Sequence, residues 1–322
     1  MVELEPIRNP ESAIQDASRR VCVIGSANTD MVVKCPHLPA PGETVLGGRF
    51  VTAPGGKGAN QAVAAARCGA EVTFVACLGD DALGDQALEH YRAEGIDVSW
   101  IRRVAGTPSG VALIFVDDAG ENEIVVVSGA NGLLTPADVE AASAAIAAAD
   151  VLLVQLETPL ETIFCALRIA REHGVTTILD PAPAQSLSGD LLRLTDLAIP
   201  NEHELSVLTG RDVQSPGDEL AAAERLLVSG VGGVIVTLGG RGALVVTRNG
   251  SERLAGVPVE AVDATAAGDA FAGGLAAGLA GGGSLKDALR FATATSALSV
   301  TKLGAQPSLP TQSEVERFLG RQ

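Results

Sequence analysis

Short apolar runs alternate with alanine-rich runs along most of this chain, and this alternation is the feature that most limits its fold. A parallel pair of strands needs a long crossover connection, and a helix of this length supplies one. The pattern therefore predicts a doubly wound, mainly parallel α/β sheet flanked by helices. The expected strands are VCVIG, VTFVACLG, VLLVQLE, TTILDPAP, LAIPN and GVIVTLG, and the expected helices cover 59–68, 137–149, 160–172 and 217–229.

Two segments, about 33–52 and 107–128, interrupt the alternation with strand-like runs that are joined by turn signals. The second contains DDAGEN, which is typical of a hairpin turn. Because two-stranded ribbons are marginal alone, we expect both segments to pair into one small β-sheet lid. The lid would cover the mouth of the core and pack on a second subunit as a homodimer.

The sequence as a whole predicts two parts. Residues 1–20 are polar and charged and would form a flexible N-terminal extension, and residues 21–322 would form a single α/β domain that includes the lid. The formal net charge of −16 argues against a nucleic-acid or anionic-membrane partner, because the long-range field would repel both. The five cysteines form no CxxC pair and fit a reducing compartment. Without an apolar leader or spanning run, the expected location is cytoplasmic.

Candidate ligand contacts follow the strands, where open α/β sheets bind their ligands. Asn28 and Asp30 come directly after the first strand. They serve equally well as a strand-end turn or as ligand contacts.

A glycine-rich loop, TAPGGKGANQ at 52–61, opens the next helix. It matches neither the P-loop nor the G-x-G-x-x-G phosphate motif, which disfavours a dehydrogenase. Lys57 and Asn60 are suited to donate to hydroxyls; alternatively, Gly58 or a neighbour only starts the helix.

Two later strands also end in carboxylates. Glu157 finishes an apolar strand, where an acidic residue is expected to emerge into solvent or a site. Asn201 and Glu204 follow another strand, and they are either a helix N-cap with its partner or a carboxylate near phosphate-bound Mg²⁺.

The stretch VDATAAGDAFAGG, at 262–274, raises the question of whether Asp269 is a helix cap or a base. Ala267, Gly268 and Asp269 at a helix start would present N–H groups to an anion, reinforced by the helix dipole. A carboxylate beside that anion is well placed to take a proton from a hydroxyl that attacks a phosphoryl group. We therefore interpret Asp269 as the base.

Taken in order, these stretches closely resemble the ribokinase-like family of sugar and nucleoside kinases, from Val21 to the C-terminus. The motifs that carry the resemblance are GSANTD, PAPGETV, GGKGANQAVAAARCGA, SGVALIFVDDAGEN, QLETP, DPAPA, PNEHE, TLGGRG, DATAAGDAF and KLGAQPS. The resemblance implies MgATP-dependent phosphorylation of D-ribose at O5, in a cleft between the α/β core and the β lid.

The resemblance also assigns residues to each part of the reaction. Asp269 would be the catalytic base, with the Ala267 and Gly268 N–H groups as an anion hole for the γ-phosphate. The residues implied for sugar binding are Asn28, Asp30, Gly56, Lys57, Gly58, Asn60, Glu157 and Asp269. Those implied for ATP binding are Asn201, Thr237, Leu238, Gly239, Gly240, Arg241, Gly242, Gly268 and Thr293.

Two cations are implied as well. Glu204 would lie near Mg²⁺, through water. Members of the family use a monovalent cation, usually K⁺, held largely by backbone carbonyls, since a large hard cation prefers oxygen. The positions that match this site are Asp263, Thr265, Ser299, Lys302, Gly304 and Ser308.

The chain departs from the family signature at Ala264, where the family has Thr, and at Ala266, where it has Gly. Both aspartates and Gly268 remain, so we expect altered local geometry with activity retained. The alternatives are a deoxyribokinase, fructokinase or nucleoside kinase of the same family, or an inactive sugar-binding regulatory protein. An aromatic content of 3% disfavours a nucleoside, whose base would need stacking partners.

Overall fold

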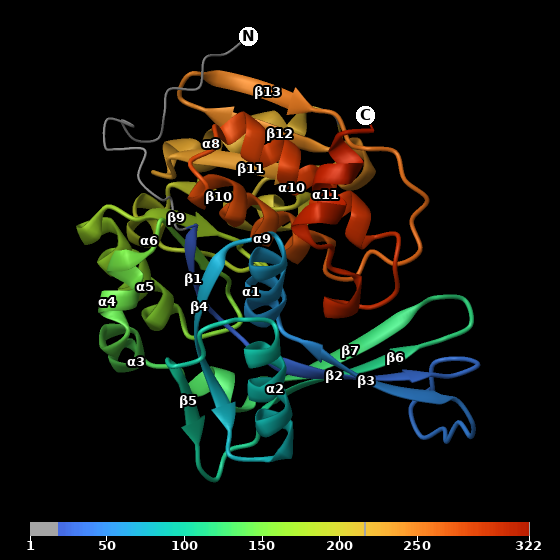
Figure 1. The fold of residues 1–322 in the computed structure, drawn as a ribbon. Helices are drawn as coiled ribbons and strands as arrows, with labels where there is room; N and C mark the ends of the chain where they lie inside the picture. The colour runs from blue at the N-terminus through green and yellow to red at the C-terminus, as the bar shows by residue number, and fades with distance from the viewer. Residues whose placement is uncertain (1–18, 216, 322) are drawn as a thin grey trace.

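The computed structural model describes residues 19–215 and 217–321, and their core is a nine-stranded sheet with helices on both faces (Figure 1). The strand order is β13-β12-β11-β10-β9-β8-β1-β4-β5. All neighbours from β11 to β5 are parallel, whereas β12 and β13 run antiparallel. The doubly wound, mainly parallel fold class is confirmed. The strands are β1 (Arg20–Ile24), β4 (Glu71–Gly79), β5 (Ile101–Val104), β8 (Val151–Val154), β9 (Thr176–Leu179), β10 (Leu197–Ala198), β11 (Gly233–Thr237), β12 (Ala243–Thr247) and β13 (Gly250–Leu254).

Both faces of the central strands are buried, which explains their continuous apolar sequence. In β1, Val21 and Val23 pack into one core cluster, while Cys22 and Ile24 pack into another on the opposite face. The first cluster contains α1 (Lys57–Arg67), α9 (Ala267–Ala280) and α10 (Leu285–Ser299), together with Tyr91 of α2 (Ala82–Ala93). The second contains α3 (Pro136–Ala141), α4 (Ser143–Ala148) and α5 (Leu160–His173).

The remaining helices lie near the antiparallel end of the sheet or at the C-terminus of the chain. A third core cluster joins β10, β11 and β12 to α6 (Gly189–Arg193), α7 (Glu202–Thr209) and α8 (Asp218–Val228). The last helix is α11 (Gln312–Leu319), and three short 3₁₀ helices are η1 (Gly129–Leu133), η2 (Gly239–Arg241) and η3 (Gln306–Ser308). No helix among the described residues is long and apolar enough to span a bilayer.

A separate four-stranded sheet projects from the core and forms the lid (Figure 1). Its order is β3-β2-β6-β7, with β2 (Asn28–Lys34), β3 (Arg49–Gly55), β6 (Gly110–Val116) and β7 (Asn122–Val127). The predicted pairing of the two segments is confirmed: β2 joins them through a parallel contact with β6. The first segment is longer than the predicted 33–52, because the chain enters the lid at Asn28, soon after β1 ends.

Three other boundaries differ from the sequence prediction. The helix expected at 137–149 is divided at Ala142 into α3 and α4, and the strand expected to reach Glu157 ends at Val154. The predicted extension 1–20 falls outside the described residues up to residue 18. Arg20 begins β1 and pairs with Glu71 of β4, and the Arg19 carbonyl accepts from Glu71 N–H at 2.8 Å, just before the strand.

Candidate active site

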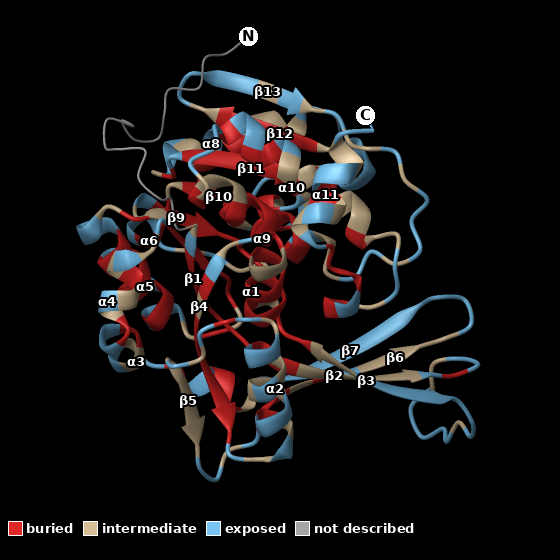
Figure 2. Ribbon diagram, viewed as in Figure 1, coloured by how far each residue is buried: buried red, intermediate tan, exposed pale blue. Residues whose placement is uncertain are grey.

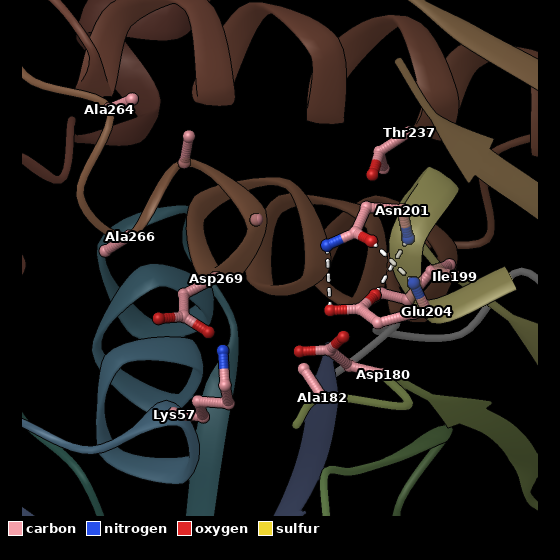
Figure 3. Close-up of a pocket in the computed structure, with 12 residues that line it drawn as sticks. Lys57, Asp180, Ala182, Ile199, Asn201, Glu204, Thr237, Ala264, Ala266 and Asp269 are labelled. Carbon is pink, nitrogen blue, oxygen red and sulfur yellow. Dashed lines mark hydrogen bonds between the residues drawn. The ribbon is translucent and has the colours of Figure 1, made fainter. Parts of the chain in front are cut away.

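A cavity of about 240 Å³ opens where the carboxyl ends of β9, β10 and β11 meet the N-termini of α1 and α9 (Figure 3). A larger cavity of about 930 Å³ adjoins it, and the two share Asn201, Thr237, Ala264, Ala267 and Gly268 in their linings. The strand-end location is the one expected for an open α/β sheet. The start of α9 therefore lies between two connected spaces.

Asp269 lies in the first turn of α9, and the residue is only 6% exposed. One oxygen accepts from Asn60 Nδ2 at 2.9 Å and the other from Gln61 Nε2 at 3.0 Å. Burial raises the pKa of Asp269, and the Lys57 ammonium and the two amide donors act against this rise. The result is a buried carboxylate with a raised pKa that is aimed into the smaller cavity.

Lys57 is the first residue of α1, and its ammonium faces Asp269 in Figure 3, with Asp180 on its other side. Burial acts to lower the pKa of Lys57, but the nearby carboxylates, of which Asp269 and Asp180 are the strongest, outweigh it and raise the pKa. Lys57 therefore stays charged and neutralises carboxylates that would otherwise repel each other.

Two further carboxylates act on Asp269: Asp30 lies on the lid strand β2, and Glu157 lies in the loop after β8. Burial, followed by repulsion from Glu157 and Asp269, raises the pKa of Asp30 to about 6. Glu157 accepts from the Ser26 hydroxyl and from Lys57 N–H, the latter at 3.0 Å. These contacts connect the end of β1, the start of α1 and the loop after β8.

Asn28, at the first position of β2, is buried and oriented by a residue that the sequence analysis missed. Asn131 Nδ2 donates to Asn28 Oδ1 at 2.7 Å, while Asn131 Oδ1 accepts from Ala27 N–H at 2.9 Å. The Asn28 oxygen is therefore occupied, and its amide NH₂ is left to serve as a donor.

The glycines of the GGKG loop are explained by close backbone contacts. A Cβ on Gly58 would lie 2.6 Å from Ser26 N, and a Cβ on Gly55 would lie 2.2 Å from the Asp30 carboxylate. Gly56 has a φ of +88°, which favours glycine. Gly58, which was assigned to sugar binding, is accounted for by this packing of α1 on β1.

The larger cavity contains most of the residues that were predicted to lie along ATP. Its lining includes Asn201, Thr237, Leu238, Gly239, Gly240, Gly242, Gly268 and Thr293. Arg241 is not part of that lining; its guanidinium pairs with Glu202, which is part of it. Apolar residues that the sequence did not indicate, Val257, Val259, Phe271 and Val300, complete the wall.

Asn201 and Glu204 form a capping box at the start of α7. The Asn201 side chain accepts from Glu204 N–H at 2.8 Å, and Asn201 N–H donates to the Glu204 carboxylate at 2.8 Å. The structural alternative for this pair is therefore realised. Both residues also line the smaller cavity, so the capping role and a ligand contact are compatible.

Asp180 adds a carboxylate that the sequence analysis missed. It follows the apolar strand β9, so the rule that selected Glu157 would have found it. Burial raises its pKa to about 8, against the attraction of Lys57. Asp180 and Glu204 both face the cavity in Figure 3, and their oxygens are of the type that Mg²⁺ prefers.

The model of the pfkB family of carbohydrate kinases matches residues 18–312. The chain belongs to this family. A ribokinase of Haemophilus influenzae is 44% identical over 301 residues, covering 94% of this chain and 98% of the relative. A deoxyribokinase of Salmonella typhi is 36% identical over 300 residues, covering 93% and 98%. The structure of Arabidopsis thaliana ribokinase complexed with ribose and ATP superposes with a TM-score of 0.86 at 32% identity, covering 93% of this chain and 99% of that chain.

The departure from the pfkB signature at residue 266 places an alanine where the backbone is left-handed. Ala266 is the N-cap of α9 and adopts a φ of +60°. Among the described residues, every other residue with a φ in this range is a glycine. The left-handed conformation costs a residue with a Cβ roughly 1–2 kcal/mol. Glycine at this position would avoid that cost.

The predicted anion hole is partly closed in this structure. Ala267 N–H donates to the Ala264 carbonyl at 3.1 Å, so one of its two predicted donors is occupied. Gly268 comes next, in the helical turn whose N–H groups lack intrahelical acceptors. A Cβ built on Gly268 meets no described atom within 4 Å. Open space therefore lies directly over this glycine.

The residues matched to the monovalent-cation site come together in one loop region. Asp263 accepts from the Thr265 N–H at 2.9 Å and from the Gly304 N–H at 2.8 Å. Partial burial acts to raise the pKa of Asp263, but these hydrogen bonds outweigh it and lower the pKa. The Lys302 ammonium contacts Glu314 at 3.1 Å. The atom of Lys302 that could bind a cation is therefore its backbone carbonyl oxygen.

The two serines of that set are buried and donate to backbone carbonyls: Ser299 to Ser296 and Ser308 to Ala305. Among the residues that the structure describes, no cluster of three His, Cys, Asp or Glu side chains is arranged to hold a metal ion. Any cation in this loop would therefore depend on carbonyls and one carboxylate, as the family resemblance implies.

Proposed function

We propose that this chain is a ribokinase, which transfers the γ-phosphoryl group of ATP to O5 of D-ribose. The observation that carries the proposal is the position of Asp269: a buried carboxylate of raised pKa at a helix N-terminus, lining a small polar cavity that adjoins a larger, partly apolar one. Similarity to the Haemophilus influenzae ribokinase over nearly the full length of both chains supports it.

The cleft then has two sides. We call Asn28, Asp30, Lys57, Asn60 and Glu157 the sugar side, because these polar residues come from the base of the lid, the start of α1 and the loop after β8, on the Asp269 side of the cleft. We call the lining of the 930 Å³ cavity the nucleotide side. Its glycine turn at η2 and its apolar wall suit a flat base and a ribose laid along the backbone, with the phosphates toward Gly268.

The reaction is an in-line displacement. The lone pair of O5 forms a bond to the γ-phosphorus, the O5 proton passes to the Asp269 carboxylate, and the bond between the γ-phosphorus and the bridging oxygen breaks, leaving its electron pair on ADP. Asp269 accepts the proton as O5 becomes bonded, so no free alkoxide is needed.

The other residues of the site balance the charges of Asp269 and of the phosphates. The Lys57 ammonium stabilises Asp269 and the carboxylates around it, and the Gly268 N–H faces the space for the γ-phosphate. Mg²⁺ accompanying ATP would lie toward Glu204 and Asp180, where it would neutralise phosphate charge. K⁺ would be held by Asp263 and the carbonyls of Thr265, Ser299, Lys302, Gly304 and Ser308.

We also propose a cytoplasmic homodimer that associates through the lid. The five cysteines are buried and free, as expected in a reducing compartment. All residues of β7 are exposed, and β7 is pale blue in Figure 2. Exposed apolar residues occur on three strands of the lid: Phe50 on β3, Leu113 on β6, and Ile124, Val125 and Val126 on β7. An apolar edge strand of this kind calls for a partner. Val126→Lys should convert a dimer to a monomer by light scattering after gel filtration; a wild-type monomer would refute the dimer.

A coupled ADP-release assay tests the function, using D-ribose, 2-deoxyribose, fructose and adenosine, each with and without K⁺. We expect the highest kcat/KM with ribose and a gain on adding K⁺. Equal values for ribose and 2-deoxyribose would overturn the specificity and favour the deoxyribokinase alternative. Ribose binding without ADP release would favour an inactive sugar-binding protein instead.

A further inference from the structure

A continuous chain of hydrogen bonds joins the surface of α2 to the carboxylate of Asp269. His90 Nε2 contacts Gln306 Oε1 at 2.8 Å, Gln306 Nε2 donates to Asn60 Oδ1 at 3.0 Å, and Asn60 Nδ2 donates to Asp269 at 2.9 Å. His90 is half-buried, whereas Gln306 is 1% exposed and Asn60 is 6% exposed. The two amides are therefore shielded from water along most of the path.

The donor and the acceptor of every hydrogen bond in this series are set by Asp269, at its inner end. An ionised carboxylate only accepts, so the Asn60 NH₂ must face Asp269. The Asn60 oxygen then faces Gln306 and requires its NH₂, which leaves the Gln306 oxygen to accept from a protonated Nε2 of His90. One reversed amide would place two acceptors or two donors against each other.

Gln306 is also fixed through its backbone. Arg67, at the end of α1, donates to the Gln306 carbonyl at 2.8 Å and to the Leu309 carbonyl at 3.0 Å, and the same guanidinium pairs at 2.6 Å with Glu94, the C-cap of α2. η3 is thus held to α1 and α2 at both the main chain and the side chain of Gln306. A residue held this firmly can impose an orientation on its neighbour.

The other oxygen of Asp269 is served by a second relay that does not involve Gln306. Gln155 Nε2 donates to Gln61 Oε1 at 2.6 Å, and Gln61 Nε2 donates to both Asp269 and Asp180. Each carboxylate oxygen therefore receives one amide whose own orientation is set by a further side chain. The two donors are neighbouring residues of α1, but Gln306 of η3 orients one and Gln155, after β8, orients the other, so the relays can be broken separately.

We propose that Gln306, held by His90, is a positioning residue for phosphoryl transfer: it fixes the Asn60 amide so that Asn60 donates to Asp269 and keeps the base aligned and ionised. This inference rests on the proposed role of Asp269. It assigns a function to Gln306 and His90, neither of which lines the cavity at Asp269.

Two substitutions at one position separate shape from polarity. Gln306→Met keeps the length of the side chain and removes its hydrogen bonds, and we expect kcat to fall about tenfold, the value of one hydrogen bond. Gln306→Glu offers only acceptors, so it favours the reversed Asn60 amide and turns the Asn60 oxygen toward Asp269. We expect a larger loss of kcat, about 100-fold, with the KM for ATP within about twofold of wild type.

The pH dependence of kcat distinguishes positioning from a merely structural role. Loss of the Asn60 donor removes a contact that lowers the pKa of Asp269, so the base remains protonated to higher pH and the acidic limb of kcat should move upward in Gln306→Met. The other titratable groups that face Asp269 are unchanged in this variant: Asp30, Lys57, Glu157, Asp180 and Glu204.

Two further variants complete the experiment. Gln312→Met is the matched control, because Gln312 is a half-buried glutamine of α11 that donates to Glu316 at 2.7 Å and belongs to neither relay, and its kcat should equal that of wild type. His90→Phe removes only the outermost link, so its loss of kcat should be smaller than that of Gln306→Met. All variants are compared for melting temperature.

The outcomes are decisive in either direction. Wild-type kcat and an unshifted acidic limb in Gln306→Met and Gln306→Glu would overturn the proposal, as would losses that simply follow melting temperature. If Gln306→Met fails to fold, Gln306→Glu and His90→Phe provide the same test. Should the wild type show no kinase activity, the carboxyl ¹³C titration of Asp269 in the unliganded protein still measures the relay: an unchanged pKa in Gln306→Met would refute it, separately from the proposed function.

Discussion

The sugar side and the nucleotide side of the cleft are built from different parts of the polypeptide. Around Asp269 the sugar side consists of charged and amide side chains that are hydrogen-bonded to one another, such as Asn60 to Asp269 and Asn131 to Asn28. The nucleotide side consists largely of glycines, alanines and apolar residues, including Gly239, Gly240 and Phe271. Buried side-chain networks require particular residues, whereas backbone surfaces mainly require small ones.

This difference predicts how each side responds to substitution. Changes on the sugar side should disturb chemistry and the ionisation of neighbouring groups. Changes on the nucleotide side should act by filling space, with little effect on folding. The four predictions below test this contrast.

The largest effect is expected for Asp269→Asn. Removal of the base should lower kcat by about 10²–10⁴-fold, because the amide cannot accept the O5 proton. Binding of a non-hydrolysable ATP analogue, measured by calorimetry, should stay within about twofold of wild type, since the larger cavity is not lined by this carboxylate. Normal turnover in this variant would disprove the assignment of the base.

Gly268→Ala tests the nucleotide side. Its methyl group would meet no described atom within 4 Å, so the fold should be unaffected, yet the methyl enters the space beside both cavities. We expect kcat/KM for ATP to fall about tenfold or more, which corresponds to about 1.4 kcal/mol, at an unchanged or higher melting temperature.

The control for this variant is Gly132→Ala, because a Cβ on Gly132 meets only Ser128 Cβ at 3.8 Å. Its ATP kinetics should match wild type. Equal kinetics in Gly268→Ala and Gly132→Ala would show that the backbone of Gly268 does not face the phosphates.

Asp180→Asn tests how a buried carboxylate near other carboxylates affects the stability of the fold. Burial raises the folded pKa of Asp180 from 3.8 to about 8. The folded state therefore holds this proton to higher pH, so the stability contributed by Asp180 is full below pH 3.8 and is lost as pH rises toward 8. Asn cannot ionise and can still accept from Gln61.

The test is urea unfolding of the ligand-free proteins. The free energy of unfolding of Asp180→Asn minus that of wild type should therefore increase from pH 4 to pH 8. A difference between the two proteins that stays constant over this range would contradict the prediction. It would mean that Asp180 remains ionised beside Lys57.

The smallest effect is expected for Ala266→Gly. Glycine removes the penalty of a positive φ but adds freedom to the unfolded chain, so the free energy of unfolding should rise by about 1 kcal/mol or less. kcat should remain within about threefold of wild type, because both aspartates and Gly268 are retained. A loss of stability on denaturant titration would show that Ala266 is not strained.

Much of the fold could be predicted because its signals are local. The apolar runs and alanine-rich runs located the central strands and most of the helices, and the turn signals located the lid hairpins. The boundaries were less certain where pairing determines them: β2 begins at Asn28 because Asn28 pairs with Gly55, where β3 ends, and with Gly110, where β6 begins. The division of one helix at Ala142 has no sequence signal that we identify.

The site was predictable to the extent that polar residues interrupt apolar strand ends. Glu157 and Asp30 were found in this way, and Asp180 could have been. Gln61, Asn131 and Gln306 carry no such signal, since each is an ordinary polar residue in its own segment. Their importance comes from partners 104 residues away for Asn131 and 208 and 246 residues away for Gln61 and Gln306.

By itself, the sequence determined the parallel α/β architecture, the presence of a lid and the carboxylate at the start of α9. These features depend on local periodicity, turn chemistry and the order of motifs, which act over short stretches of chain. Only the tertiary structure decided that Asn201 and Glu204 cap a helix, that Arg241 turns to Glu202, and that Asp269 is held by two separate amide relays. Those outcomes depend on which side chains packing brings within hydrogen-bond distance, and the burial of a polar group is compensated only when such partners are present.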